Sequence, residues 1–136
     1  MKDEELIEAA RKASEKAVAI SPNKGDTKEF GAVGAAILSS HGTIYTGVSL
    51  VLDCGIGFCA EHSAVAEMIK NGETEIQKIV AITPEGILLP PCGRCRELIY
   101  QIDKKNLNTE VILKEGRKSK IKDLLPEIWQ NEVRKN

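Results

Sequence analysis

The four cysteines constrain the fold of this chain more than any other feature. They occupy positions 54, 59, 92 and 95, and the last two lie within the segment Pro91-Cys92-Gly93-Arg94-Cys95. The N-terminus is polar and acidic, without the basic start and long apolar run of a signal peptide, so we expect a cytoplasmic location. Cytoplasmic thiols are seldom paired in disulfides. We therefore expect these cysteines to bind a metal, to take part in catalysis or to be buried in the core.

The length and charge of the chain narrow its class. Its 136 residues fit one domain, residues 1–136, which is large enough to bury a core without disulfides. Lysine plus arginine number 19 against 20 for aspartate plus glutamate. This balance gives no reason to expect a nucleic acid or an anionic membrane as partner, and no stretch reaches the roughly 18 apolar residues of a spanning helix. We therefore expect a small molecule as the ligand.

The first half of the chain predicts a helix followed by a hairpin. Over residues 3–20, apolar residues recur at the steps of three and four that are typical of an amphipathic helix. The set comprises Leu6, Ile7, Ala10, Ala13, Ala17 and Ile20. Turn-forming residues at 21–25 end this helix. Residues 32–38 are almost wholly apolar, and a turn at residues 39–42 joins them to a second strand at residues 43–51.

The second half alternates between helices and strands. The expected elements are a helix at 59–70, a strand at 76–83, a helix at 92–104, strands at 109–113 and 118–120, and one or two short helices over 121–133. This order predicts an α/β fold with three layers, α/β/α, in which helices cover both faces of a mixed five-stranded sheet. It also places Cys59 and Cys92 at the starts of two helices.

The cysteine spacing predicts a catalytic zinc site. Such a site uses three protein ligands and leaves the fourth position for water, whereas a structural site fills all four positions. Cys92 and Cys95 are one helical turn apart, so both sulfurs can reach one ion, and Cys59 supplies a third sulfur from the start of the other helix. The backbone amides at a helix N-terminus stabilise thiolates. We therefore expect Cys59, Cys92 and Cys95 to bind Zn²⁺.

Glu61 is the candidate proton carrier. It lies two residues past Cys59, in the first turn of the same helix, close to the metal but not needed as a ligand. A carboxylate in this position can take a proton from water and deliver protons to a ring nitrogen and to the departing amine, as in zinc deaminases. Three thiolates would give the zinc complex a charge of about −1. Arg94, Arg96 and His62 are placed to offset that charge.

Each of these residues also has a simpler interpretation. Cys54 could be the fourth ligand of a structural zinc site in a non-catalytic module, although a lone cysteine is more typical of a small buried residue. Glu61 could be an ordinary first-turn glutamate that is favoured by the helix dipole. Arg94 and Arg96 could be solvated helix charges, and His62 could face a neighbour or solvent.

The two-part motif resembles the signature of the cytidine deaminase family in its three-cysteine form. The segment Cys59-Ala60-Glu61, followed by Pro91-Cys92-Gly93-Arg94-Cys95, is the basis of this resemblance, which covers residues 33–129. Residues 39–48, 92–96 and 124–126 are more similar to the blasticidin S deaminase branch. The resemblance implies hydrolytic deamination, with release of ammonia, of a cytosine-type base in a nucleoside or nucleoside-like compound. Cytidine, deoxycytidine or a blasticidin S-like molecule would be the substrate, and the protein would be a homotetramer with active sites near subunit contacts.

The expected substrate-binding positions depart from the family pattern. In cytidine deaminases an asparagine and a glutamate usually follow the second strand, and Ser49 and Val51 occupy the matching positions here. The aromatic residue that usually precedes the first core strand falls on Gly31, with Phe30 one position away. Trp129 either closes a pocket as an aromatic lid or packs on the core. By resemblance, the substrate-binding residues are Ser49, Phe30, Ala60 and Trp129. A carboxylate for sugar hydroxyls is missing, so the resemblance implies deamination without assigning cytidine as the substrate.

Overall fold

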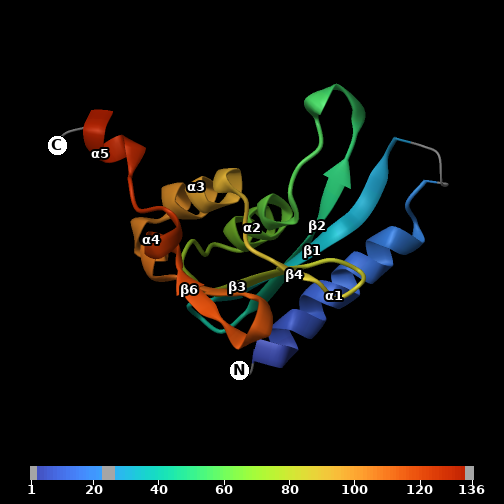
Figure 1. The fold of residues 1–136 in the computed structure, drawn as a ribbon, viewed down its shortest axis with the longest axis horizontal. Helices are drawn as coiled ribbons and strands as arrows, with labels where there is room; N and C mark the ends of the chain where they lie inside the picture. The colour runs from blue at the N-terminus through green and yellow to red at the C-terminus, as the bar shows by residue number, and fades with distance from the viewer. Residues whose placement is uncertain (1–2, 23–26, 134–136) are drawn as a thin grey trace.

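The computed structural model describes residues 3–22 and 27–133 of the chain (Figure 1). The helices are α1 (Asp3–Ala19), α2 (Ala60–Lys70), α3 (Gly93–Ile102), α4 (Ile121–Leu124) and α5 (Trp129–Val133). The strands are β1 (Glu29–Ser39), β2 (Ile44–Val51), β3 (Ile76–Ile82), β4 (Leu88–Leu89), β5 (Glu110–Ile112) and β6 (Lys118–Lys120). Within this described part, no helix has the length and apolar character that crossing a membrane requires.

One mixed sheet forms the centre of the fold. Five strands follow the order β2-β1-β3-β5-β6, and the two-residue strand β4, which the sequence did not predict, pairs with β3. β1 and β2 form the predicted antiparallel hairpin. β3 and β5 run parallel, because α3 lies between them in the chain and returns it to the same end of the sheet. The prediction of a mixed sheet is therefore confirmed.

Helices cover both faces of the sheet, which confirms the three-layer α/β/α fold. Figure 1 shows α1 on one side of the sheet and α2 and α3 on the other. Side chains of β1 alternate between the two cores: Ala35 and Ile37 pack with α2 and α3, whereas Ala36 and Leu38 pack with α1. A strand buried on both faces needs apolar residues at successive positions, which explains the unbroken apolar run in β1.

The first helix is shorter than the sequence predicted. α1 ends at Ala19, so Ile20 lies beyond it and is 76% exposed instead of joining the buried stripe. Ser14 is buried in that stripe, and its Oγ donates a 2.6 Å hydrogen bond to the carbonyl oxygen of Gly31. This bond allows the hydroxyl to lie in the core without an unsatisfied donor. The turn predicted at residues 21–25 lies partly outside the described residues.

Two glycines set the distance between the helices and the sheet. A Cβ atom on Gly47 of β2 would lie 2.3 Å from the backbone nitrogen of Ala64 in α2 and 2.6 Å from the carbonyl oxygen of Ala60. A Cβ atom on Gly34 of β1 would lie 2.2 Å from the carbonyl oxygen of Ala10 in α1, on the opposite face. Both glycines therefore permit a helix backbone to pack directly on a strand.

Asn106 joins three segments of backbone in the second half of the chain. Its side chain is fully buried and donates to the carbonyl oxygens of Thr74 (2.9 Å) and Ile99 (3.0 Å). Its Oδ1 accepts a 2.8 Å bond from the amide of Ile76. These bonds attach the C-terminal half of α3 to the start of β3, and they fix the orientation of the helix whose N-terminus carries two cysteines.

Candidate functional site

Two helix N-termini bring three sulfur atoms together. Cys59 and Cys92 are the N-cap residues of α2 and α3, and Cys95 lies in the first turn of α3 with no exposed surface. The Sγ of Cys92 lies 3.7 Å from that of Cys59 and 3.6 Å from that of Cys95. The three sulfurs all lie within 4.8 Å of one another. The structure therefore places together the three cysteines that the sequence proposed as zinc ligands.

The spacing and environment of these sulfurs suit a zinc ion. Thiolates at about 2.3 Å from a tetrahedral ion lie about 3.8 Å apart, which is close to the two measured separations. Burial raises the pKa of the Cys59 and Cys95 thiols. A bound cation would favour the thiolate form of both groups. The donor set fits a Zn²⁺ site with three protein ligands.

Cys54 lies outside this sulfur cluster. It sits in the 3-10 turn Asp53–Gly55 with a positive φ of 61°, and its side chain is exposed. The prediction of a buried Cys54 is wrong, because no residue of this turn is buried against the core. A four-cysteine site is not formed among the residues that the structure describes.

Glu61 is buried beside the sulfur cluster. Its side chain is only 4% exposed, and it lines the same cleft as Cys59 and Cys92. Burial raises the pKa of its carboxyl group, and a hydrogen bond with the Cys95 thiol acts in the opposite direction. A carboxyl group that is buried next to metal-type ligands is typical of a site where protons are moved.

The cleft has a volume of about 520 Å³, within the usual range for a small-molecule site. We call the lining residues that come from β1, β2 and the loop after β2 the β2 wall, and they are Ala32, Val33, Ser49, Leu50, Val51, Leu52, Gly55, Gly57 and Phe58. We call the remaining lining residues the sulfur side, and they are Cys59, Ala60, Glu61, Ala81, Leu89, Pro90, Cys92 and Arg94. Ser49 is the one residue of the β2 wall with a polar side chain, and its Oγ accepts a 3.0 Å bond from the amide of Val33.

The three charged residues proposed near the metal differ in what they contact. Arg94 lines the cleft, and its charge adds to burial in lowering the pKa of His62. The Nε2 atom of His62 is buried and has no hydrogen-bond partner among the described residues. Arg96 instead donates to the carbonyl oxygens of Pro91 (2.8 Å) and Leu124 (3.2 Å). Arg96 thus ties the backbone that precedes Cys92 to the end of α4.

Two of the predicted substrate-binding residues lie in the cleft and two do not. Ser49 and Ala60 line it. Phe30 lies in β1 opposite Leu50 and is not part of the lining, where Val33 and Phe58 are found instead.

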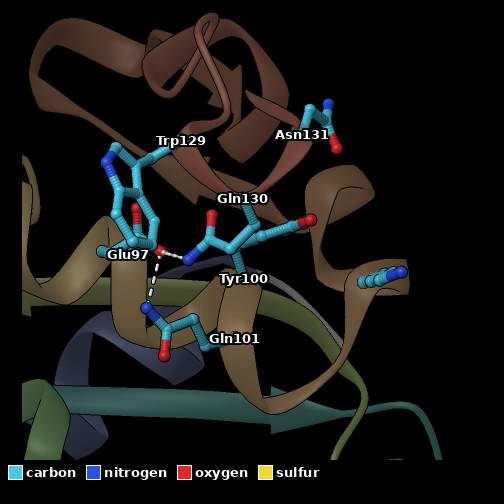
Figure 2. A pocket seen from close by; sticks show the side chains of 7 residues that line it. Glu97, Tyr100, Gln101, Trp129, Gln130 and Asn131 are labelled. Carbon is cyan, nitrogen blue, oxygen red and sulfur yellow. Dashed lines mark hydrogen bonds between the residues drawn. The ribbon is translucent and has the colours of Figure 1, made fainter. Parts of the chain in front are cut away.

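Trp129 lies in a different part of the molecule. It lines a separate pocket between α3 and α5, where Gln101 and Gln130 both donate to Oε2 of Glu97 (Figure 2). Its side chain is 62% exposed, so the expectation that Trp129 packs on the core is wrong. The reason is that α5 is a five-residue helix with no buried residue.

Several residues of the cleft were missed by the sequence interpretation. Leu89 and Pro90 enter it from β4 and the segment before α3, and Leu52 and Phe58 enter it from the loop after β2. Their only sequence signal was their position next to the cysteine motifs. The importance of Gly47 had a clearer signal, since a glycine inside a strand often marks a close approach of another backbone.

A mixed sheet between two helix layers, with a cluster of three thiols and a buried carboxyl group beside one cleft, is the arrangement of a zinc-dependent hydrolytic enzyme. Residues 2–111 match the family described as "Cytidine and deoxycytidylate deaminase zinc-binding region". The chain belongs to this family, and it is a hydrolytic deaminase that acts on C–N bonds.

Individual relatives agree with this assignment. Cytidine deaminase from Mycobacterium tuberculosis (strain ATCC 25618 / H37Rv) is 31% identical over 99 residues, which span 72% of this chain and 72% of the relative. Blasticidin-S deaminase from Bacillus cereus is 36% identical over 76 residues, which span 49% of this chain and 54% of the relative. The crystal structure of cytidine deaminase from Mycobacterium leprae superimposes with a TM-score of 0.75 at 26% identity, covering 93% of this chain and 99% of that one.

Proposed function

We propose that this protein deaminates a cytosine-type base that is carried in a nucleoside or nucleoside-like compound, and releases ammonia. The observation that supports this most strongly is the buried Glu61 carboxyl in the same cleft as the sulfur cluster. The similarity to both a cytidine deaminase and a blasticidin-S deaminase supports a cytosine-type ring while leaving several substrates to be compared.

In this proposal Cys59, Cys92 and Cys95 hold Zn²⁺ and Glu61 moves the protons. When bound, Zn²⁺ supplies Lewis-acid chemistry that makes water acidic enough to attack at neutral pH. Glu61 takes a proton from the attacking water and transfers it to the ring nitrogen next to the attacked carbon. It carries the second proton to the amino group. The C–N bond then breaks, ammonia leaves, and a carbonyl group remains on the ring.

Other residues close to the sulfur cluster would orient and balance this chemistry. Arg94 supplies positive charge close to a complex that carries about −1 from three thiolates and Zn²⁺. His62, with a buried Nε2, lies one residue beyond Glu61 on α2. Ala60 leaves room for a planar ring next to Cys59, because its side chain is a single methyl group.

The assembly and location of the protein are also proposals. The resemblance to cytidine deaminases supports a homotetramer, and the sequence supports a cytoplasmic location. Sedimentation of the purified protein at several concentrations tests the assembly, since a species of four chains is expected and a stable monomer would contradict it.

The substitution Glu61→Gln tests the mechanism. It keeps the size of the side chain and removes its ability to carry a proton, so we expect turnover to fall at least about 10²-fold while zinc is retained. Ammonia release should be measured on cytidine, deoxycytidine, cytosine and blasticidin S, with metal content measured on the same samples. Deamination at the wild-type rate by Glu61→Gln would refute the assigned role.

Cys54→Ser is the matched control for the metal site. Because Cys54 is exposed and outside the cluster, the variant should keep both zinc and activity. Loss of zinc from this variant would instead support a structural site with four cysteine ligands.

A further inference from the structure

Among the residues that the structure describes, the β2 wall offers few side chains that could recognise a hydroxyl. Eight of its nine residues have apolar side chains or none, and it contains no carboxylate, amide or basic side chain. The charged groups of the cleft, Glu61 and Arg94, both belong to the sulfur side. The two halves of the cleft therefore differ sharply in chemistry.

Ser49 is the exception, and it is already engaged. Its side chain is buried, and its Oγ accepts the amide hydrogen of Val33 across the sheet. Its hydroxyl retains one hydrogen to donate and one further lone pair to accept with. This one side chain cannot pair with both hydroxyls of a vicinal diol in the way that a carboxylate can.

Two acidic residues occur close by in the chain but do not line the β2 wall. Asp53 accepts a 2.9 Å bond from the Thr27 hydroxyl and lies 3.5 Å from the Lys28 ammonium group. Glu29 is the cross-strand partner of Val51, and it is exposed and outside the lining.

The geometry of the reaction determines which part of a substrate meets this wall. In a cytosine-type ring the carbon that carries the amino group is opposite the nitrogen that carries the substituent, N1. When that carbon is directed toward Glu61 and the sulfur cluster, the N1 substituent is directed away from them. The rest of the lining, which is the β2 wall, is then left to contact this substituent.

We infer that the apolar β2 wall makes this enzyme indifferent to the hydroxyl groups of the N1 substituent, so that cytosine-type bases with hydroxyl-free N1 substituents are substrates as good as cytidine. This inference rests on the proposed function and specifies its substrate class. A site built to hydrogen-bond a substrate hydroxyl rejects the analogue that lacks it by about 10⁴-fold or more. Without such groups, we expect values of kcat/KM that agree within about fivefold.

A substrate series on the unmodified, zinc-loaded protein tests this inference. The series consists of cytidine, deoxycytidine, 2′,3′-dideoxycytidine and 1-propylcytosine, which remove hydroxyls stepwise while the reacting ring is unchanged. Similar kcat/KM values across the series are the expected result. A preference of 100-fold or more for cytidine over dideoxycytidine would overturn the inference and leave the proposed function standing. If no member of the series were deaminated, the proposed function would fail, and this inference would fail with it.

A gain-of-function variant provides a second, independent test. Leu52 lines the β2 wall and is partly exposed, so Leu52→Glu places a hydrated carboxylate there without burying a charge in the core. We expect this variant to favour cytidine over dideoxycytidine by at least about tenfold, because the new carboxylate accepts hydroxyl hydrogens. The matched control is Val133→Glu, at an exposed position of α5, which should leave the ratio unchanged. Equal ratios for Leu52→Glu and the control would contradict the assignment of this wall to the N1 substituent.

Discussion

Replacing Gly47 with alanine should damage the site through the fold. The new Cβ would lie 2.3 Å from the Ala64 nitrogen and 2.6 Å from the Ala60 carbonyl oxygen, about 1 Å short of ordinary contact. Both neighbours are backbone atoms of α2, so no side chain can rotate away. The helix must therefore move from the sheet, and it carries Cys59 and Glu61 with it.

The size of the effect follows from two opposing terms. Overpacking of this kind costs about 1–3 kcal/mol, and contact with backbone atoms places Gly47→Ala near the upper end. Replacing glycine by alanine within a strand stabilises the folded state by about 0.5–1 kcal/mol, because alanine loses less conformational entropy on folding. We expect a net loss of about 2 kcal/mol in the free energy of unfolding. A displacement of about 1 Å at a reacting group costs about 10²-fold in rate, so kcat/KM should fall by that factor.

Gly34→Ala separates stability from site geometry. Its Cβ would lie 2.2 Å from the Ala10 carbonyl oxygen of α1, on the face opposite to the cysteines. This variant should lose similar stability in urea unfolding but keep its zinc and its kcat/KM well below the unfolding temperature. The reasoning would be refuted if Gly47→Ala retained wild-type activity, or if both variants lost activity equally.

Three further predictions concern stability and the metal. Asn106→Ala removes three hydrogen bonds to buried backbone and should lower the free energy of unfolding by about 3–4 kcal/mol; a loss under about 1 kcal/mol in urea unfolding would contradict this. Arg96→Met frees the backbone before Cys92 and should speed zinc transfer to a chelator about tenfold, whereas Lys122→Met, at an exposed position of α4, should not. The hydrogen bond from Tyr45 lowers the pKa of Glu73 below its usual 4.5, so this contribution to stability is present above pH 4.5 and is lost as the pH falls through the folded-state pKa. Tyr45→Phe should therefore be less stable than wild type at pH 7, and the difference measured by unfolding should shrink in acid.

The parts of the fold that the sequence predicted are those set by local patterns. The apolar run of β1 and the motif at Cys92 and Cys95 each depend on residues that are close in the chain, and both have the expected structure. The proximity of Cys59 to this pair could also be predicted. Each motif lies at the N-terminus of a helix, and both helices pack on the same sheet. The roles of these residues in catalysis stay a prediction.

The parts that the sequence did not predict depend on tertiary packing. Ile20 continues the apolar period of α1, but the helix ends one residue earlier and leaves its side chain exposed. Cys54 and Trp129 are residue types that are usually buried, and here they lie on short segments with no buried residues. Neither composition nor periodicity reports whether such a segment docks on the core.

The loop after β2 has a consequence for how such an enzyme can change over evolutionary time. Residues 52–58 supply much of the β2 wall and project beyond the end of the sheet (Figure 1). The backbone pairing of Leu50 with Phe58 closes the base of this loop, and exposed side-chain contacts to Asp53 restrain its tip. No residue of this loop belongs to either core, so changes at its exposed tip can alter the range of accepted compounds while the metal-binding helices stay the same.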